Sequence, residues 1–285
     1  MTAHYFVHSH FFSKATFLCK IYVSLYSMRI GHIILYVIVF VLFFPFKSQA
    51  TEKADTLNEQ RAINNCKFNA KHLILPGTLI AVGASSLFFS PMEDLDHSLQ
   101  KDFQELRSNH HSIELDEYLR FLPIATNYAL HFTGVKSGYD TREQLLLTAT
   151  SFVTMYALTQ GLKHTIDRKR PDGSDNHSFP SGHVATAFLG AEQLRMNYGT
   201  WWGLAGYSVA TGTAFLRLYN NRHWFSDVIG AAGIGILSAR IGYWLLPWEK
   251  CVFGLNKNKS SVNIFAMPTF DTYNSSYGLA MTIQF

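Results

Sequence analysis

The sequence predicts an all-α protein that ends in a small C-terminal β-hairpin. Apolar runs of helical length recur between residues 73 and 246, separated by polar or Gly- and Pro-rich loops. Hydrophobic residues make up 48% of the 285-residue chain, whereas charged residues make up only 15%, against about 25% in average soluble domains. This balance favours membrane contact or a deeply buried helical body.

Residues 1–50 have the pattern of a targeting segment. From Met28 a short basic start precedes an apolar run over 33–46, and Ser48-Gln49-Ala50 places small residues where a signal peptidase reads them. The run is short for a membrane span, so a signal peptide with Met28 as the true start is favoured. An uncleaved N-terminal anchor is the alternative. In either case we expect the chain to be exported or inserted.

The rest of the chain divides into a linker, a helical body and a tail. Residues 51–72 are the linker, residues 73–250 the helical domain and residues 251–285 the tail. Residues 93–120 are rich in charge and His and are expected to face solvent. Within the domain, helices are predicted at 73–90, 121–135, 144–162, 182–197, 202–217 and 224–246.

The last predicted helix is rich in small residues, which suits close helix packing. In the tail, runs at 262–269 and 277–285 flank a turn and predict the hairpin. A hairpin packed on the helical body is favoured over the end of an outer-membrane barrel, because one hairpin cannot make a barrel.

Composition and spacing exclude several classes of site. The net charge of +4 comes without a basic run, so no nucleic-acid partner is expected. No cysteine spacing resembles a zinc site, and the loop after residue 166 lacks the acidic ladder of a calcium loop. Cys66 and Cys251 flank the helical body, and they either pair as a disulfide or remain two free thiols.

Three polar clusters lie where the predicted helices begin or end, and their residue types suit a phosphoryl group. They are Lys163 with Arg170; Ser181, Gly182 and His183; and Arg217 with His223 and Asp227. Fixed positive donors stabilise the charge on phosphoryl oxygens, as a point charge from lysine and as bidentate contacts from arginine. Ser181 and Gly182 open a helix, where free backbone N–H groups favour an anion.

His223 and Asp227 fit a nucleophile and the group that orients it. They are four residues apart near the start of a helix and share one face, so the carboxylate can hold one ring nitrogen and leave the other free to attack. His183 is a second imidazole near the same anion and is the candidate general acid. This set needs neither a metal nor a cofactor.

The three clusters resemble the signature of the type 2 phosphatidic acid phosphatase and vanadium-dependent haloperoxidase superfamily. That pattern is Lys, six residues, Arg-Pro; then Pro-Ser-Gly-His; then Ser-Arg, five residues, His, three residues, Asp. All three blocks occur in order within residues 144–246, and one position departs, because Leu216 stands where the family usually has Ser. The resemblance implies a bundle of about six helices with the active site at one end.

The resemblance also implies a role for each residue of the clusters. His223 would form a phosphohistidine intermediate, Asp227 would orient it and His183 would be the general acid. The phosphate would be bound by Lys163, Arg170, Ser181, Gly182 and Arg217. Outside this set, His177 is expected to be exposed, and we interpret three cations as solvated or loosely steering an anion: Arg168, Lys169 and Arg222.

The leading hypothesis is a phosphatase in the cell envelope that acts outside the cytoplasm on a lipid-linked phosphate, in contact with the membrane. Candidate substrates are phosphatidic acid, phosphatidylglycerophosphate, undecaprenyl diphosphate and the phosphates of lipid A. An active site outside the cytoplasm requires an even number of crossings before residue 163, which holds if 121–135 does not span. A soluble periplasmic acid phosphatase is the runner-up, and a vanadate-dependent haloperoxidase and a non-catalytic envelope protein rank lower.

Overall fold

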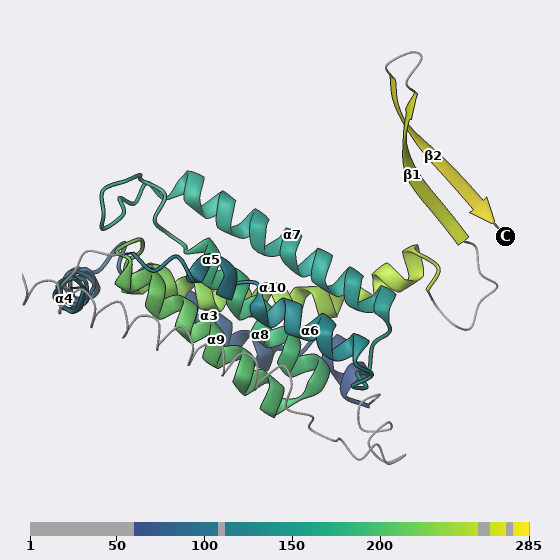
Figure 1. Cartoon of the computed structure of the whole chain (residues 1–285), viewed down its shortest axis with the longest axis horizontal. Helices are drawn as coiled ribbons and strands as arrows, with labels where there is room; N and C mark the ends of the chain where they lie inside the picture. Colours follow the sequence, from purple (N-terminus) through teal and green to yellow (C-terminus); the bar gives the residue numbers. More distant parts are fainter. Residues whose placement is uncertain (1–59, 108–111, 256–262, 272–275, 285) are drawn as a thin grey trace, which may run out of the picture. The chain divides into compact units, whose positions relative to one another are not determined.

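The computed structural model describes residues 60–107 and 112–255, together with the backbone of residues 263–271 and 276–284. Between residues 60 and 255 the chain is a set of helices joined by loops, so the predicted all-α body is confirmed (Figure 1). The predicted signal peptide and the alternative start at Met28 lie outside the described residues.

Each predicted helical run is observed as one helix, with ends that differ from the prediction by a few residues. These helices are α3 (Ile74–Ser85), α6 (Leu122–Phe132), α7 (Thr141–Thr165), α8 (Gly182–Tyr198), α9 (Thr200–Tyr219) and α10 (Phe225–Val252). The region expected to face solvent forms two further helices, α4 (Ser90–Leu106) and α5 (Asp116–Leu119), and a 3-10 helix, η1 (Ala70–Leu73), precedes α3.

Helix α10 packs against α3, α7 and α8, and α8 packs in turn against α6 and α9. The small residues predicted to allow close packing lie at these contacts. A Cβ atom on Gly235 would overlap the carbonyl of Ala185, and one on Gly83 would overlap the backbone of Gly230. The helices therefore approach backbone to backbone, and an apolar core fills the space among α7, α8 and α10.

Helix α8 is buried over most of its length, although its second half carries charged residues. Glu192 is 1% exposed and lies 2.7 Å from Arg195 Nε and 2.6 Å from Arg240 Nε, and it also accepts a hydrogen bond from the Tyr207 hydroxyl. Because a buried charge is tolerated only when it is paired and hydrogen-bonded, this network lets α8 lie inside the bundle.

Among the described residues, α7 and α10 are long and apolar enough to cross a membrane. Helices α3 and α4 pass the same test together, but they are bent by 84° at the break between them. Large apolar side chains on α7 are exposed, among them Leu145, Val153 and Tyr156. Helix α6, with 11 residues, is too short to span, as the predicted topology requires.

The C-terminal strands β1 (Asn263–Asp271) and β2 (Ser276–Gln284) pair antiparallel. The register joins Asn263 to Gln284 at one end and Asp271 to Ser276 at the other. The packing of this hairpin on the helical body stays a prediction. Of the two alternatives for the cysteines, the structure has free thiols at both Cys66 and Cys251.

Candidate active site

The predicted site residues lie at four helix ends and in the loops that join them. Lys163 is in the last turn of α7 and Arg217 in the last turn of α9, whereas Ser181 is the N-cap of α8 and Asp227 is in the first turn of α10. The backbone N–H of Ser181 donates to the carbonyl of Asp227, which ties the start of α8 to the start of α10.

His223 is buried, and its main partner is a backbone carbonyl. Its Nδ1 lies 2.8 Å from the carbonyl oxygen of Ser178, and it lies 3.6 Å from Asp227 Oδ2. The carbonyl can only accept, so Nδ1 carries the proton and Nε2 keeps its lone pair. Asp227 is thus an ion-pair partner of the ring, beyond hydrogen-bond length, and the Ser178 hydroxyl donates to the same Asp227 oxygen.

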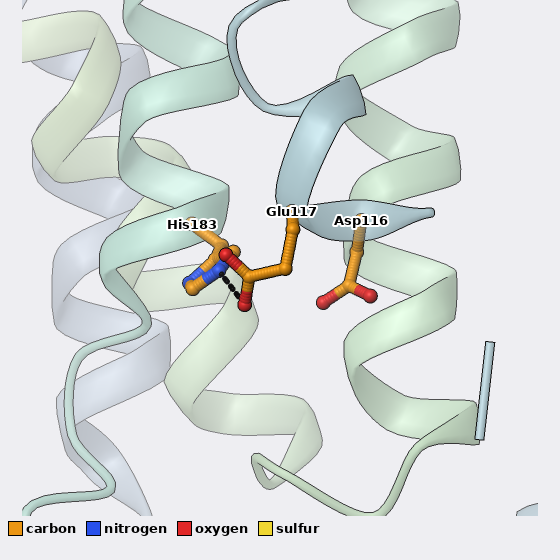
Figure 2. A group of neighbouring side chains, drawn as sticks. All are labelled: Asp116, Glu117 and His183. Atoms are coloured by element: carbon orange, nitrogen blue, oxygen red, sulfur yellow. Dashed lines mark hydrogen bonds and ion pairs between the residues drawn. The ribbon is translucent and has the colours of Figure 1, made fainter. Parts of the chain in front are cut away.

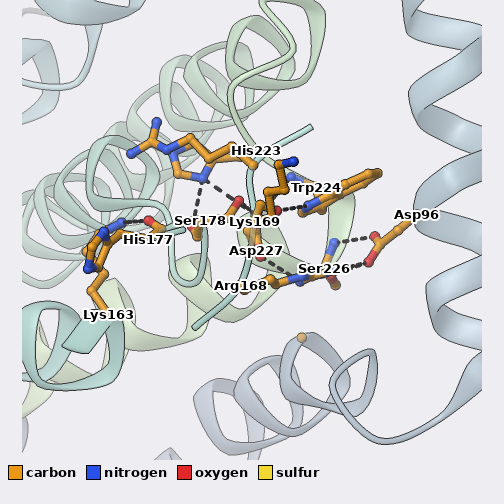
Figure 3. Close-up of polar contacts among 12 residues, drawn as sticks. Asp96, Lys163, Arg168, Lys169, His177, Ser178, His223, Trp224, Ser226 and Asp227 are labelled. Carbon is orange, nitrogen blue, oxygen red and sulfur yellow. Dashed lines mark hydrogen bonds and ion pairs between the residues drawn. The ribbon is translucent and has the colours of Figure 1, made fainter. Parts of the chain in front are cut away.

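Asp227 is held by donors from three directions (Figure 3). Arg168 Nη1 lies 2.6 Å from Oδ1, the Trp224 backbone N–H donates to Oδ2 at 2.9 Å, and Ser178 completes the set. The same guanidinium reaches Asp96 of α4, with Nη2 2.6 Å from Oδ2. Both carboxylates are buried, so Arg168 joins two charges that would otherwise be unpaired inside the protein.

Lys163 and Arg170 are each fixed by the loop between them and α8. The ammonium of Lys163 donates to the carbonyl of His177 at 2.5 Å, and Arg170 Nε lies 2.8 Å from Asp175 Oδ1. Residue 177 therefore anchors Lys163, while the next carbonyl along the chain, that of Ser178, anchors His223. One short segment sets the positions of two predicted functional groups.

Two predicted phosphate-binding residues carry buried donors that no described residue satisfies. Ser181 is fully buried and its hydroxyl has no hydrogen-bond partner among the described residues. Arg217 is 6% exposed, and its Nη1 is paired with Asp116 at 2.7 Å while its Nε is unsatisfied within the same part of the chain. At Gly182, a Cβ atom would have no described atom within 4 Å other than those of its chain neighbours and of its own helix backbone. Because buried donors are normally satisfied, these groups fit an anion that binds between α8 and α9.

His183 faces α5. Its Nε2 lies 2.8 Å from Glu117 Oε1 (Figure 2), and the other carboxylate oxygen lies 3.1 Å from Arg120. Ligand atoms of Asp116, Glu117 and His183 all lie within 4.8 Å of one another, a spacing that suits a metal ion. However, Asp116 already accepts from Arg217 and from Asn220 Nδ2, so its oxygens are engaged by donors of this chain.

Residues 144–251 match the family model described as the PAP2 superfamily. The segment that carries the three motifs is therefore similar to the PAP2 superfamily. A lipid A 1-phosphatase from Porphyromonas gingivalis is 35% identical over 136 residues, which cover 46% of this chain and 31% of that protein. The chain thus spans about a third of the length of this relative.

Two solved structures are also similar to this chain. LpxE of Aquifex aeolicus has 21% identity and a TM-score of 0.39, and the match covers 50% of this chain and 92% of that one. A transmembrane PAP2-type phosphatidylglycerolphosphate phosphatase from Bacillus subtilis has 19% identity and a TM-score of 0.44, with 65% and 99% covered.

Burial sets the charge of both histidines in the PAP2 site. Burial lowers the pKa of His223 to about 4, and Asp227 offsets only part of this effect. Burial also lowers the pKa of His183 to about 4, with the positive charges of Arg217 and Arg120 acting in the same direction and Glu117 opposing them. Without a bound anion, both imidazoles are therefore neutral at pH 7.

The structure corrects the interpretation of Arg168. It is neither solvated nor steering, because its side chain is 13% exposed and is paired with two buried carboxylates, and its guanidinium lies 5.8 Å from the Trp224 ring centre. The expectation that residues 93–120 face solvent is wrong at Asp96 and Asp116, which are buried. Three acidic residues and one serine of this site were not predicted from the sequence: Asp96, Asp116, Glu117 and Ser178.

Two cavities lie at different distances from the PAP2 motifs. One of about 520 Å³ borders Arg170 and is lined by Arg168, Asp96 and Trp224 as well. Another of about 1090 Å³ lies between the C-terminal part of α10 and the start of α7, and none of the predicted site residues lines it. Of the predicted site residues, Arg170 therefore lines a cavity on the α4 side of the motif loop.

Proposed function

We propose that the chain is a metal-independent phosphatase that removes phosphate from a lipid-linked substrate in the cell envelope through a phosphohistidine intermediate. The observation that carries this proposal is the pair of buried, unsatisfied donors at Ser181 and Arg217, beside a buried histidine whose Nε2 keeps its lone pair. Two donors and a nucleophilic nitrogen around one bound anion are the groups that phosphoryl transfer requires.

In the first step the phosphoryl group lies among Lys163, Arg170, Arg217 and the N-terminus of α8, which stabilise the charge on its oxygens. Nε2 of His223 attacks phosphorus, the bond to the leaving oxygen breaks, and its electron pair departs with that oxygen. His183 gives the leaving oxygen a proton. In the second step, water attacks the phosphohistidine and gives a proton to His183, which releases phosphate and neutral His223.

The exposed apolar faces favour a lipid substrate over a soluble one. Helix α7 is long enough to span a membrane and is 22% buried over its apolar window, so most of its apolar surface requires another apolar environment. Among lipid phosphates, a phosphate of lipid A leads, because the relative from Porphyromonas gingivalis is a lipid A 1-phosphatase. Phosphatidic acid, phosphatidylglycerophosphate and undecaprenyl diphosphate are the other candidates. We further propose that the site faces the periplasm.

The test is phosphate release in detergent and EDTA from lipid A, the other candidate lipids and soluble phosphate esters. The wild-type protein is compared with His223→Ala, and the matched control is His164→Ala, an exposed histidine near the same loop. We expect release from lipids with the wild type and the control, and a loss of about 10⁴-fold or more in His223→Ala.

Full activity in His223→Ala would contradict the phosphohistidine. Equal release from soluble esters would identify a broad-specificity phosphatase instead, and loss of activity in EDTA would contradict metal independence. Vanadate, which mimics the pentacoordinate state of phosphorus, is expected to inhibit the wild type.

A further inference from the structure

Helix α5 supplies two adjacent carboxylates to two different parts of the proposed site. Asp116 pairs with Arg217 of α9, and Glu117 pairs with His183 at the start of α8 (Figure 2). Both acidic residues lie before the segment that matches the PAP2 model, which begins at residue 144. The phosphate-binding arginine and the proposed general acid are therefore each held from outside that segment.

The contact with Glu117 fixes which nitrogen of His183 carries the first proton. Burial alone would raise the pKa of Glu117, but the hydrogen bond to His183 and the positive charges of Arg120 and Arg217 outweigh this effect and lower the pKa, so this carboxylate is ionised at neutral pH. An ionised carboxylate only accepts, so Nε2 of His183 must donate to it. The other nitrogen, Nδ1, is then the one available to a leaving oxygen.

We infer that Glu117 is a positioning residue, which fixes the tautomer of His183 and stabilises its protonated form so that Nδ1 can protonate the leaving oxygen. This inference rests on the proposed function, in which His183 is the general acid. Neutral His183 with Nε2–H bonded to Glu117 has no proton for the leaving group. The reactive form is the imidazolium, in which Nε2–H stays on Glu117 and Nδ1–H is given up when the P–O bond breaks.

The charges around His183 explain why a carboxylate is needed there. The positive charges of Arg217 on α9 and of Arg120 at the end of α5 both oppose a positive imidazolium. Asp116 is the other nearby carboxylate, but it is paired with Arg217. Within the described part of the chain, Glu117 is the carboxylate that hydrogen-bonds the ring, and the negative charge of a bound phosphoryl group adds to its effect.

The first arm of the test varies the leaving group. Glu117→Gln keeps the shape and an oxygen acceptor but removes the charge. We expect turnover of alkyl phosphates, whose leaving oxygen needs a proton, to fall about 10- to 100-fold, while turnover of 4-nitrophenyl phosphate changes by less than about threefold. Glu117→Asp is expected to recover part of the loss.

Two neighbouring variants are matched controls for this arm. Asp116→Asn loosens Arg217, so it should raise KM for alkyl and aryl phosphates alike, without dependence on the leaving group. Glu114→Gln makes the same change of charge at an exposed position of the same segment and is expected to leave both activities unchanged. An equal loss on both classes of substrate in Glu117→Gln would overturn the inference while leaving the proposed function intact.

The second arm does not depend on activity. The His183 ring is titrated by NMR in detergent with inorganic phosphate present, and its signal is assigned by its loss in His183→Asn. We expect the His183 pKa to be lower in Glu117→Gln than in the wild type, and no change in Glu114→Gln. If the wild type hydrolysed no phosphate ester, the proposed function would fail, and an unchanged His183 pKa in Glu117→Gln would still overturn the role of Glu117 by itself.

Discussion

Residues 144–251 and residues 90–120 contribute to the same site in different ways. The first segment carries the PAP2 motifs and supplies the cations and both histidines. The second carries none of the motifs, but it supplies a carboxylate to Arg168, to Arg217 and to His183, from α4 in the first case and from α5 in the other two. One segment provides the groups proposed to react, and the other neutralises and positions them.

This difference follows from the electrostatics of the proposed phosphate-binding site. Positive side chains that converge on one anion repel one another when that anion is absent, and burial makes the repulsion stronger. Arg170 is balanced by Asp175 from its own loop, whereas Arg217 is balanced by Asp116 from α5. Substitution of the carboxylates of residues 90–120 alone should therefore impair the site even though all motif residues are still present.

The largest effect that tests this comparison is expected at Arg168. Arg168→Ala leaves Asp96 and Asp227 as buried carboxylates without their shared cation, which costs about 3–5 kcal/mol of unfolding free energy when a buried pair is broken. Because Asp227 also moves relative to His223, kcat should fall about 10³-fold or more. Thermal unfolding in detergent and steady-state phosphate release measure the two losses.

Arg222→Ala is the matched control for that prediction. Arg222 lies in the same region and pairs with Asp172 at 3.0 Å, but its side chain is 47% exposed, so its loss should cost about 1 kcal/mol or less. If Arg168→Ala lost as little stability and activity as this control, the buried ion pairs of Arg168 with Asp96 and Asp227 would be shown to support neither folding nor turnover. Asp96→Asn, which weakens the bridge from the side of α4, is expected to lie between the two.

The sequence predicts the motif-bearing half of this site far better than its carboxylate half. Its helices, the small-residue contacts of α10 and the place of each motif residue at a helix end or in the adjoining loop follow from periodicity and spacing along the chain. The partners of Arg168, Arg217 and His183 do not, because they lie 72, 101 and 66 residues away. Asp96 and Glu117 look like ordinary acidic residues of a polar segment until the fold brings α4 and α5 to the helix ends.

Arg168 shows a second limit of interpretation from sequence. In a loop that also holds Lys169 and Arg170, one arginine cannot be told from another by local chemistry, and all three suit an anion. Only the position of α4 decides that Arg168 faces two buried carboxylates, while Arg170 faces Asp175. Similarly, no pattern marks Ser178, whose carbonyl and hydroxyl both serve the His223–Asp227 pair.

A smaller effect is expected at Ser181, which belongs to the motif-bearing segment. Its hydroxyl is buried without a hydrogen-bond partner among the described residues, so Ser181→Ala removes no contact of the substrate-free protein. We expect the melting temperature to stay the same or rise, while the affinity for vanadate falls about tenfold through loss of one hydrogen bond to a charged ligand. Vanadate inhibition and thermal unfolding, measured on the same preparation, test both parts.

A loss of stability in Ser181→Ala with unchanged vanadate inhibition would contradict this separation and would assign the hydroxyl to the fold. The neighbouring Thr186 offers a control, because its hydroxyl already donates to the carbonyl of Gly182 at 2.9 Å. Thr186→Val removes that internal bond, and it is therefore expected to lower stability slightly without a direct effect on vanadate binding.

The smallest and most gradual effect is the dependence of stability on pH, in which each segment supports one histidine. Burial lowers the pKa of His223 and of His183 from 6.5 to about 4, and the opposing carboxylates are Asp227 for the first and Glu117 for the second. The unfolded chain therefore binds protons that the folded chain does not between these values. The contribution of the two neutral histidines to the free energy of unfolding should be complete above about pH 6.5 and should be lost as the pH drops towards 4.

Melting temperatures measured across this range should decline in the wild type, and less steeply in His223→Ala. Glu117→Gln should decline more steeply than the wild type at the low end, because His183 then resists protonation further in the folded state. Curves of equal slope for all three proteins would mean that the lowered pKa of His223 contributes nothing to stability and that Glu117 does not set the charge of His183.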